Sequence, residues 1–272
     1  MSSSDLKLFA VFGNPVAHSL SPLMHQAAFN RMGLKAQYVP FCVKDIGRAV
    51  EGIRGLDIQG VSVTLPFKTE VMNYLDEVEE DARRIGAVNT IQNNRGRLTG
   101  YNTDWKGFVL SLKEGLKIKG KQFAVIGAGG AARGIVYGLI KEGGHPIILN
   151  RTLSEAEALG KEFGCPFLPF SEKEKIQADC LINTTSLGMS PDTEISPFPR
   201  GLLKEFPWVM DIIYNPLKTK LLKEAEEAGC RTMSGLSMFV HQGAEQIKIW
   251  TGQEPPRAYM KEVVLAKLKE ND

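Results

Sequence analysis

The chain has 272 residues, 43% hydrophobic and 24% charged, which is enough for two medium-sized domains or one α/β barrel. Its 33 lysines and arginines against 31 aspartates and glutamates leave a net charge of +2, with no basic run that could follow a phosphate backbone. These values exclude a disordered or fibrous protein and argue against nucleic acid as a partner.

The four cysteines are spread singly along the chain without a CxxC pair, which is typical of a protein in the reducing cytoplasm. The first residues lack the basic start, apolar centre and cleavage site of a signal peptide, so we expect no export. The most apolar stretch, 123–140, is interrupted by Arg133 and predicts a strand, a turn and a helix rather than a membrane span. The four histidines show no metal-ligand spacing, so no metal is expected.

Over the first hundred residues, β-rich runs alternate with helical patterns, which predicts βαβ units and a parallel sheet. Strands are expected at residues 6–12, 36–43, 58–65, 87–94 and 97–102. Ser21 and Pro22 mark a helix start, with the Ser21 hydroxyl as its cap, and a second helix is expected to start at Pro66. Another helix is expected from about Asp104 to Glu114.

A second βαβ series starts at residue 122, after the short polar segment 116–121, which we interpret as the junction between two domains. Its later strands are expected at residues 145–150, 178–185 and 207–214. After Gly235 the pattern is helical, and a last helix is expected at 257–269. Because such amphipathic helices must pack on something, we expect them to return to the first domain.

Residues 127–133, GAGGAAR, follow an apolar strand and open a helix, which is the context of a dinucleotide fingerprint of the GxGxxG/A type. Gly127 permits the tight turn, Gly129 lets the backbone approach a pyrophosphate, and Ala132 allows close packing of the helix. The helix N-terminus adds free amides and a positive dipole end. A strand-to-helix turn without a ligand is the alternative, but the context favours a dinucleotide.

The end of the next strand distinguishes NADP from NAD, because NAD-binding folds usually carry an acid there for the ribose hydroxyl. This chain instead has Asn150, Arg151 and Thr152. Arg151 can pair bidentately with a 2′-phosphate, and its two neighbours can add hydrogen bonds. An ordinary surface arginine is the alternative; its position favours NADP.

In the N-terminal half, Ser19 and Ser21 lie on a strand-to-helix turn that suits a small carboxylate, although Ser21 could merely cap its own helix. Lys68 is expected in the first turn of a helix, where the dipole disfavours a cation. A surface lysine is the default interpretation of any lysine, yet this unfavourable placement makes Lys68 a candidate proton carrier. Asn89 and Asp104 supply an amide and a carboxylate nearby, and each alone could be a turn or cap residue.

Three further features of the second half carry polar groups. The polar loop 183–189 follows a strand, Tyr214 is expected to end a strand, and Gln242 interrupts an apolar helix face. A packed loop, a buried aromatic ring and a solvated glutamine are the alternative interpretations.

The chain resembles the shikimate dehydrogenase family in nine segments that occur in the same order over nearly its whole length: GNPVAHSLSP, VSVTLPFK, GAVNT, NTDWKG, GAGGAAR, NRT, NTTSLGM, DIIYNP and GLSMFVHQGAEQ. The resemblance implies reduction of 3-dehydroshikimate to shikimate with NADPH in aromatic amino-acid biosynthesis. It implies an α/β protein with two domains. A mixed or parallel substrate domain would span 1–103 with 238–272, and a Rossmann-type, doubly wound NADP domain would span 104–237.

The resemblance also implies roles for individual residues. Lys68 and Asp104 correspond to the catalytic pair. The substrate-binding residues are Ser19 and Ser21 for the carboxylate, Thr64, Asn89 and Gln242 for the ring oxygens, and Tyr214 near the carboxylate and nicotinamide. The cofactor-binding residues are Gly127, Ala128, Gly129, Gly130, Ala131, Asn150, Arg151, Thr152, Thr184, Ser186 and Gly235. The expected partner is a small-molecule substrate, in a monomer or homodimer without nucleic acid or membrane.

Two positions depart from the commonest family pattern. Ser62 stands where many members have asparagine, which bears on recognition of the ring, and Glu155 stands where many have a second arginine, which softens the NADP preference. A quinate or quinate/shikimate dehydrogenase using NAD or NADP is the alternative enzyme. A catalytically silent, nucleotide-sensing relative is the alternative from another class, and the presence of both Lys68 and Asp104 argues against it.

Overall fold

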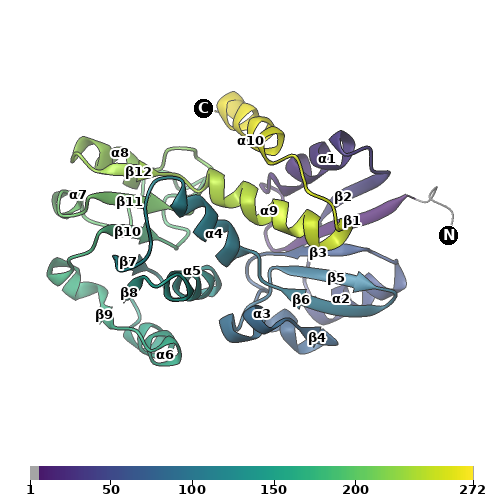
Figure 1. Ribbon diagram of the computed structural model, residues 1–272, viewed down its shortest axis with the longest axis horizontal. Coiled ribbons are helices and arrows are strands. Elements are labelled where there is room, and N and C mark those ends of the chain that lie inside the picture. Colours follow the sequence, from purple (N-terminus) through teal and green to yellow (C-terminus); the bar gives the residue numbers. More distant parts are fainter. Residues whose placement is uncertain (1–5, 272) are drawn as a thin grey trace. The chain divides into compact units, whose positions relative to one another are not determined.

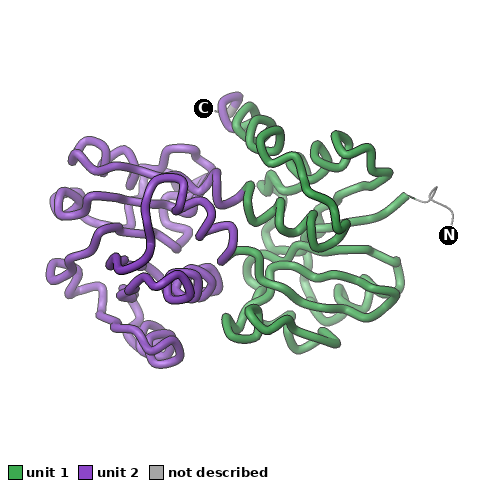
Figure 2. The backbone as a smooth tube through the Cα atoms, viewed as in Figure 1, with its two compact units in different colours: residues 1–104, 240–267 green, residues 105–239, 268–272 purple. Residues whose placement is uncertain are grey.

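The computed structural model describes residues 6–271 and divides the chain into two compact units (Figure 2). Unit 1 comprises Met1–Asp104 and Val240–Lys267, and unit 2 comprises Trp105–Phe239 and Leu268–Asp272. The first boundary follows Asp104, so the polar segment 116–121 lies inside unit 2, and our interpretation of it as the junction was wrong. Ile118, in the middle of that segment, is buried in unit 2 and anchors it there.

Six strands form the sheet of unit 1 in the order β2-β1-β3-β5-β6-β4 (Figure 1). Their bounds are β1 Lys7–Gly13, β2 Ala36–Cys42, β3 Gly60–Val63, β4 Glu77–Val78, β5 Thr90–Asn94 and β6 Arg97–Tyr101. The first three strands pair in parallel, whereas β5 runs antiparallel to both β3 and β6. Arg95 and Gly96 join β5 to β6 with φ of 54° and 89°, the backbone that a two-residue hairpin turn requires. The sheet is therefore mixed.

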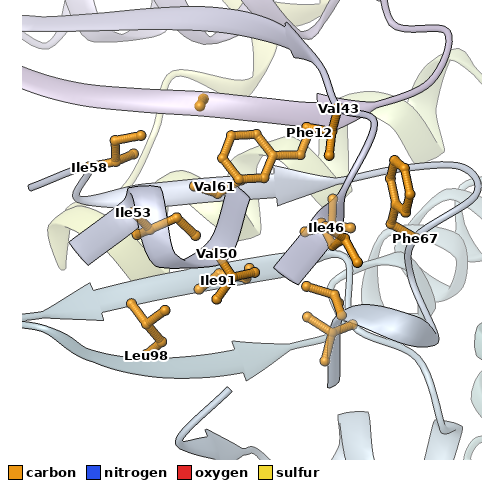
Figure 3. Packing of buried hydrophobic residues seen from close by; sticks show 14 of the residues in the cluster. Phe12, Val43, Ile46, Val50, Ile53, Ile58, Val61, Phe67, Ile91 and Leu98 are labelled. Atoms are coloured by element: carbon orange, nitrogen blue, oxygen red, sulfur yellow. The ribbon is translucent and has the colours of Figure 1, made fainter. Parts of the chain in front are cut away.

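The helices that belong to unit 1 are α1 Ser21–Arg31, α2 Ile46–Gly55, α3 Glu80–Ile85 and the short 3-10 helix Glu70–Tyr74, with α9 Leu236–Thr251 and α10 Arg257–Asn271 contributing from Val240 to Lys267. On α2, Ile46, Val50 and Ile53 recur at helical spacing and pack with Val61 and Ile91 of the sheet into one buried cluster (Figure 3).

The C-terminal part of α9 packs directly on this sheet. A Cβ at Gly60 of β3 would lie 2.4 Å from the Trp250 indole, so only glycine allows the close approach. The indole nitrogen of Trp250 also donates a hydrogen bond of 2.9 Å to the carbonyl of Ile91. These contacts hold the end of α9 within unit 1.

Two helix starts differ from the prediction. The first helix begins at Ser21, with Leu20 in the cap position, and the Ser19 hydroxyl accepts a hydrogen bond from the Ser21 N–H at 3.2 Å, so Ser21 is not the cap. No α-helix starts at Pro66. Phe67 packs in the hydrophobic core, and its N–H donates a hydrogen bond to the carbonyl of Thr64, which closes a turn before the 3-10 helix. Lys68 therefore lies in a turn, and the argument from a helix dipole does not apply to it.

Unit 2 contains a six-stranded, fully parallel sheet in the order β12-β11-β10-β7-β8-β9. The strands are β7 Gln122–Ile126, β8 His145–Asn150, β9 Phe167–Pro169, β10 Cys180–Asn183, β11 Trp208–Asp211 and β12 Arg231–Met233. This is the strand order of doubly wound dinucleotide-binding folds, in which the chain reverses direction across the sheet between β7 and β10. The carboxyl ends of these two strands are the expected place for a nucleotide.

Helix α4 Asp104–Lys113 precedes β7. The strands of unit 2 are connected by α5 Gly130–Lys141, α6 Leu153–Phe163, the 3-10 helix Phe170–Lys175, α7 Arg200–Leu203 and α8 Lys220–Glu227. Strand β11 ends at Asp211, where the buried carboxylate accepts a hydrogen bond from the Ile213 N–H and turns the chain out of the sheet. Tyr214 consequently lies in the following loop, not at the end of the strand as predicted. Across residues 6–271, no helix combines the length and the apolar character needed to cross a membrane.

Candidate functional site

An almost buried ion pair lies at the carboxyl edge of the unit 1 sheet. The Lys68 ammonium donates to Oδ2 of Asp104 at 2.7 Å, and the two side chains are only 15% and 8% exposed. Such a pair is desolvated on most sides, so each charge depends on the other. The two residues singled out as a catalytic pair are thus in direct contact.

Asn89 completes this arrangement from the side of β5. Its amide nitrogen donates to Oδ1 of Asp104 at 2.8 Å and to the Thr103 hydroxyl at 3.0 Å. Its amide oxygen accepts from the Thr103 N–H at 2.7 Å and from the Thr90 hydroxyl at 2.8 Å. Because both ends of the amide are occupied by partners of the right kind, its orientation is fixed and each carboxylate oxygen of Asp104 has a donor.

Backbone contacts hold the loop that carries Lys68. The carbonyl of Lys68 accepts a hydrogen bond of 2.7 Å from the Val88 N–H, next to Asn89. The preceding residue, Phe67, is 7% exposed and packs into the buried cluster of unit 1. The lysine is therefore placed by a core anchor on one side and by the chain entering β5 on the other.

The other predicted substrate residues of unit 1 lie on three segments. Ser19 and Ser21 are at the start of α1, where the Ser19 hydroxyl already bonds to the Ser21 backbone, and Ser21 is 8% exposed. Thr64 directly follows β3, and Gln242 lies on α9, both half-buried. These four positions stay predictions as substrate contacts.

In unit 2, the glycine-rich turn follows β7 at the strand reversal. Gly127 has φ of 110°, and a Cβ there would lie 2.6 Å from the Thr184 hydroxyl, which follows β10. That hydroxyl donates a 2.6 Å hydrogen bond to the carbonyl of Ile126. Glycine is required here by both backbone conformation and space, and the turn brings the predicted cofactor residues Gly127 and Thr184 together.

The glycine at position 129 has a different explanation. Its backbone is extended, with φ of −81°, and a Cβ there would meet no atom within 4 Å. Neither strain nor internal packing therefore requires glycine at the cap of α5, where Gly130 and Ala131 begin the helix. Open space before a helix N-terminus is what a pyrophosphate needs in order to approach backbone amides, so the turn fits a dinucleotide.

The loop after β8 carries the residues predicted to distinguish NADP from NAD. Arg151 and Thr152 are exposed, and Thr152 precedes α6. The side-chain amide of Asn150 donates to the Thr152 carbonyl at 3.0 Å and to the Glu155 carboxylate at 2.7 Å. Glu155 is therefore engaged by Asn150, and the Arg151 guanidinium remains exposed beside it.

The remaining predicted residues of unit 2 lie on loops that follow β10, β11 and β12. Ser186 is exposed on the turn after β10, and Tyr214 stacks on Phe239 with ring centroids 4.0 Å apart. The Gly235 N–H donates to the Ile213 carbonyl at 3.0 Å, and a Cβ at Gly235 would lie 2.0 Å from the Ile212 carbonyl oxygen. Only glycine allows these two backbone segments to approach so closely.

A second buried carboxylate, which the sequence analysis missed, organises this edge of unit 2. Asp211 accepts hydrogen bonds from Asn183 at 3.1 Å, from the Ile213 N–H at 3.1 Å and from Thr219 at 2.8 Å. Burial outweighs these three bonds and raises the pKa of Asp211 to about 6. The carboxylate thus ties together the ends of β10 and β11 and the start of α8.

Gln246 and His25 were also missed. Both are buried polar residues of unit 1, and the amide oxygen of Gln246 lies 3.1 Å from Nε2 of His25. Gln246 lies four residues after Gln242 on α9, so helical periodicity could have indicated that both face the same way. Within residues 6–271, no group of three or more histidine, cysteine or acidic side chains could hold a metal.

Comparison with known protein families gives two matches. Residues 11–91 match the model described as shikimate dehydrogenase substrate binding domain, and residues 235–265 match the one described as shikimate 5'-dehydrogenase C-terminal domain. The first match contains Lys68 and Asn89, and the second contains Gln242 and Gln246.

Individual relatives match over almost the whole chain. The chain is 48% identical to a shikimate dehydrogenase (NADP(+)) of Geobacillus kaustophilus, covering 97% of this chain and 99% of the relative. It is 41% identical, with a TM-score of 0.91, to a shikimate dehydrogenase crystallised with NADP+, covering 97% and 96% of the two chains. A shikimate 5-dehydrogenase from Thermus thermophilus in complex with NADP(H) and shikimate has 38% identity and a TM-score of 0.88, covering 96% and 99%.

Asp211→Asn should change how the stability of the protein depends on pH. The folded carboxyl has a pKa of about 6 against an ordinary 3.8, so between these values the folded state keeps a proton that the unfolded state has lost. The contribution of Asp211 to the free energy of unfolding therefore falls by about 3 kcal/mol as the pH rises from about 4 to about 6. Asparagine is uncharged throughout, so the variant should gain stability relative to the parent over this range.

Urea denaturation of both proteins across this pH range measures the difference. His25 contributes with the opposite sign: burial lowers its pKa from 6.5 to about 4, so stability is lost as the pH falls between these values, where the unfolded state binds a proton and the folded state does not. It is present in both proteins and cancels in the comparison. If the difference in unfolding free energy between Asp211→Asn and the parent stayed constant with pH, the raised pKa of Asp211 would be contradicted.

Proposed function

The chain belongs to the shikimate dehydrogenase family, and on that basis we propose which of its residues perform the reaction of an oxidoreductase that reduces 3-dehydroshikimate to shikimate with NADPH. The observation that carries the proposal is the Lys68–Asp104 contact of 2.7 Å beside Asn89. A lysine ammonium can give a proton to an oxygen atom, and the carboxylate fixes where that ammonium lies.

In this mechanism Lys68 donates a proton to the carbonyl oxygen of the substrate as negative charge develops there, and accepts it again in the reverse direction. Asp104 holds the Lys68 ammonium through Oδ2 and binds a ring hydroxyl of the substrate. When bound, NADPH supplies the hydride to the carbonyl carbon. The protein's own part is thus to position and to move one proton.

The carboxylate of the substrate is assigned to the start of α1. Ser19 and Ser21 place two hydroxyls at the N-terminal end of that helix, where the helix dipole favours an anion. Thr64, Asn89 and Gln242 are assigned to the ring oxygens, and Tyr214 is assigned as a further substrate-binding residue.

In unit 2, the amides at the N-terminus of α5 and the open space at Gly129 fit the pyrophosphate of NADP. Arg151, exposed after β8, is assigned to the 2′-phosphate, with Asn150 and Thr152 beside it. Ala128, Gly130 and Ala131 complete the turn, and Ser186 and Gly235 are assigned to the cofactor from the neighbouring loops.

We also propose that the enzyme works in the cytoplasm as a monomer or homodimer. All four cysteines, Cys42, Cys165, Cys180 and Cys230, are free thiols, and a reducing compartment keeps them so. Sedimentation of the purified protein tests the assembly, and fractionation of cells tests the location.

Lys68→Ala should reduce kcat by a factor on the order of 10² to 10⁴, because the reaction loses its positioned proton donor while the other substrate contacts remain. Asp104→Ala should behave similarly, with a larger rise in KM because the ring hydroxyl also loses a partner. Initial rates of NADP reduction with shikimate measure both variants, and Lys35→Ala, an exposed lysine of unit 1, is the control. If Lys68→Ala kept more than about a tenth of the parent kcat, the proposed role of Lys68 as proton donor would be wrong.

The exposed loop after β8 should set the cofactor preference. Arg151→Ala should lower the ratio of kcat/KM for NADP to that for NAD by more than about tenfold, because the 2′-phosphate loses its cation. Glu155→Arg should raise the ratio by a few-fold up to about tenfold, as expected for one exposed charge. Both effects should shrink at high salt.

Glu174→Arg makes the same charge change at another exposed position of unit 2 and should leave the ratio unaltered. A parent enzyme that prefers NAD, or an unchanged ratio in Arg151→Ala, would show that this loop does not bind the phosphate.

Shikimate should be preferred over quinate by at least about tenfold in kcat/KM, equivalent to roughly 1.4 kcal/mol in transition-state binding. Quinate has an additional hydroxyl on the carbon that bears the carboxylate, and a site with two serines close to that carbon must find both room and a partner for it. Rates measured with both substrates and both cofactors decide the question, and equal or faster turnover of quinate would identify a quinate/shikimate dehydrogenase instead.

A further inference from the structure

A buried chain of hydrogen bonds connects α9 to the site described above. Gln246 is 1% exposed, and its amide oxygen accepts from the Ser62 hydroxyl at 2.8 Å. Its amide nitrogen donates to the backbone carbonyl of Asn89 at 3.1 Å and to the Thr90 hydroxyl at 3.0 Å. One side chain on α9 therefore bonds to two consecutive residues at the start of β5.

The direction of each hydrogen bond in this chain is determined by its ends. A backbone carbonyl can only accept, so the Gln246 nitrogen must face Asn89 and the Gln246 oxygen must face Ser62. The Tyr38 hydroxyl donates to the Ser62 oxygen at 2.6 Å, which leaves the Ser62 proton for Gln246. Both hydrogen-bonding functions of the Ser62 hydroxyl are thus committed to the chain.

The hydrogen-bond chain continues from Gln246 toward the Lys68–Asp104 ion pair. Because Gln246 donates to the Thr90 hydroxyl, the single Thr90 proton is available for the amide oxygen of Asn89, 2.8 Å away. The Asn89 amide nitrogen is then turned toward Oδ1 of Asp104 at 2.8 Å. Donors and acceptors run in one direction from Gln246 through Thr90 and Asn89 to the carboxylate, an arrangement in which each bond polarises the next.

Aromatic and apolar side chains pack closely around Gln246. His25 lies beside the Gln246 oxygen and stacks on Tyr38 with ring centroids 4.3 Å apart, and burial lowers its pKa to about 4. Gly243, one helical turn before Gln246 on α9, admits α1 so closely that a Cβ there would lie 2.3 Å from the Met24 side chain. The glutamine is consequently held in a tightly packed environment.

We propose that Gln246 is a positioning residue for the reaction: through Thr90 it fixes the side-chain amide of Asn89, and thereby the Asp104 carboxylate that holds Lys68. The inference rests on the proposed function, since it assigns Gln246 to the same ion pair. Gln246 itself is too deeply buried to act on the substrate directly, so its effect is on the geometry of the groups that do.

Gln246→Met tests the proposal, because methionine has a similar length and makes no such hydrogen bonds. We expect kcat to fall by about tenfold or more, with KM changed by less than about threefold, since misplaced groups slow the reaction more than they weaken binding. The matched control is Asn93→Leu. Asn93 is another buried amide of unit 1, which bonds to the Ile58 carbonyl and the Gly96 N–H and has no link to Asp104.

Asn93→Leu should lose stability but keep kcat, when all proteins are assayed well below their unfolding temperatures. A Gln246→Met enzyme with kcat within about twofold of the parent, or with a loss matched by Asn93→Leu, would overturn the proposal.

Thr90 provides an independent route that does not require Gln246→Met to fold. Thr90→Val removes the hydroxyl that transmits the effect, and we expect a loss of kcat similar to that of Gln246→Met, whereas Thr90→Ser should restore it. The double variant should be no slower than the slower single variant, because both changes interrupt the same chain. The proposed role of the hydrogen-bond chain would be contradicted if the kcat losses of the two single variants multiplied in the double variant. It would also be contradicted if Thr90→Val were as active as the parent.

The Lys68→Ala experiment separates this inference from the proposed function. If Lys68→Ala stays active, the catalytic assignment fails; if it is inactive while the Thr90 and Gln246 variants behave as the parent, only the positioning role fails.

Discussion

A buried carboxylate is tolerated only where charged and hydrogen-bonding partners replace the water it has lost, and Asp104 is where this constraint shapes unit 1. Its partners come from separate segments: Lys68 from the turn after β3, and Asn89 from the residue before β5. Removing Lys68 would leave the buried carboxylate without a countercharge, and removing Asn89 would leave Oδ1 without its donor. The β3 turn, the start of β5 and the first residue of α4 are therefore held together by one group.

Unit 2 also contains a buried carboxylate, but its hydrogen-bonding partners are of a different kind. Asp211 is buried at the carboxyl edge of the parallel sheet, and its three hydrogen-bond donors are all uncharged. Without a cation, burial dominates and raises its pKa to about 6. The group shapes the loops beside the glycine-rich turn, whereas the turn itself offers amides and open space at Gly129. One unit thus holds a buried ion pair and the other an open helix N-terminus.

Local sequence patterns identified most of the helices and strands, because their periodicities and the glycine-rich turn depend on residues that are close together in the sequence. Predictions failed where contacts between residues distant in the sequence determine where an element begins or ends, or which residues matter. Pro66 looked like a helix start, but the core takes Phe67 and closes a turn. Tyr214 looked like a strand end, but Asp211 stops the strand earlier. Gln246 was missed because its significance lies in Thr90 and Asn89, more than 150 positions away.

The central claim is that Lys68 moves the proton of the substrate oxygen that is reduced, while Asp104 holds the Lys68 ammonium and a ring hydroxyl. A crystal structure of the enzyme with shikimate and NADP tests it most directly. The Lys68 ammonium is expected within hydrogen-bonding distance of the ring oxygen that forms the carbonyl of the oxidised substrate, and the Asp104 carboxylate within hydrogen-bonding distance of a ring hydroxyl, with the contact between the two side chains retained. Shikimate bound with its carboxylate against Lys68, or with its ring hydroxyls away from both side chains, would contradict it.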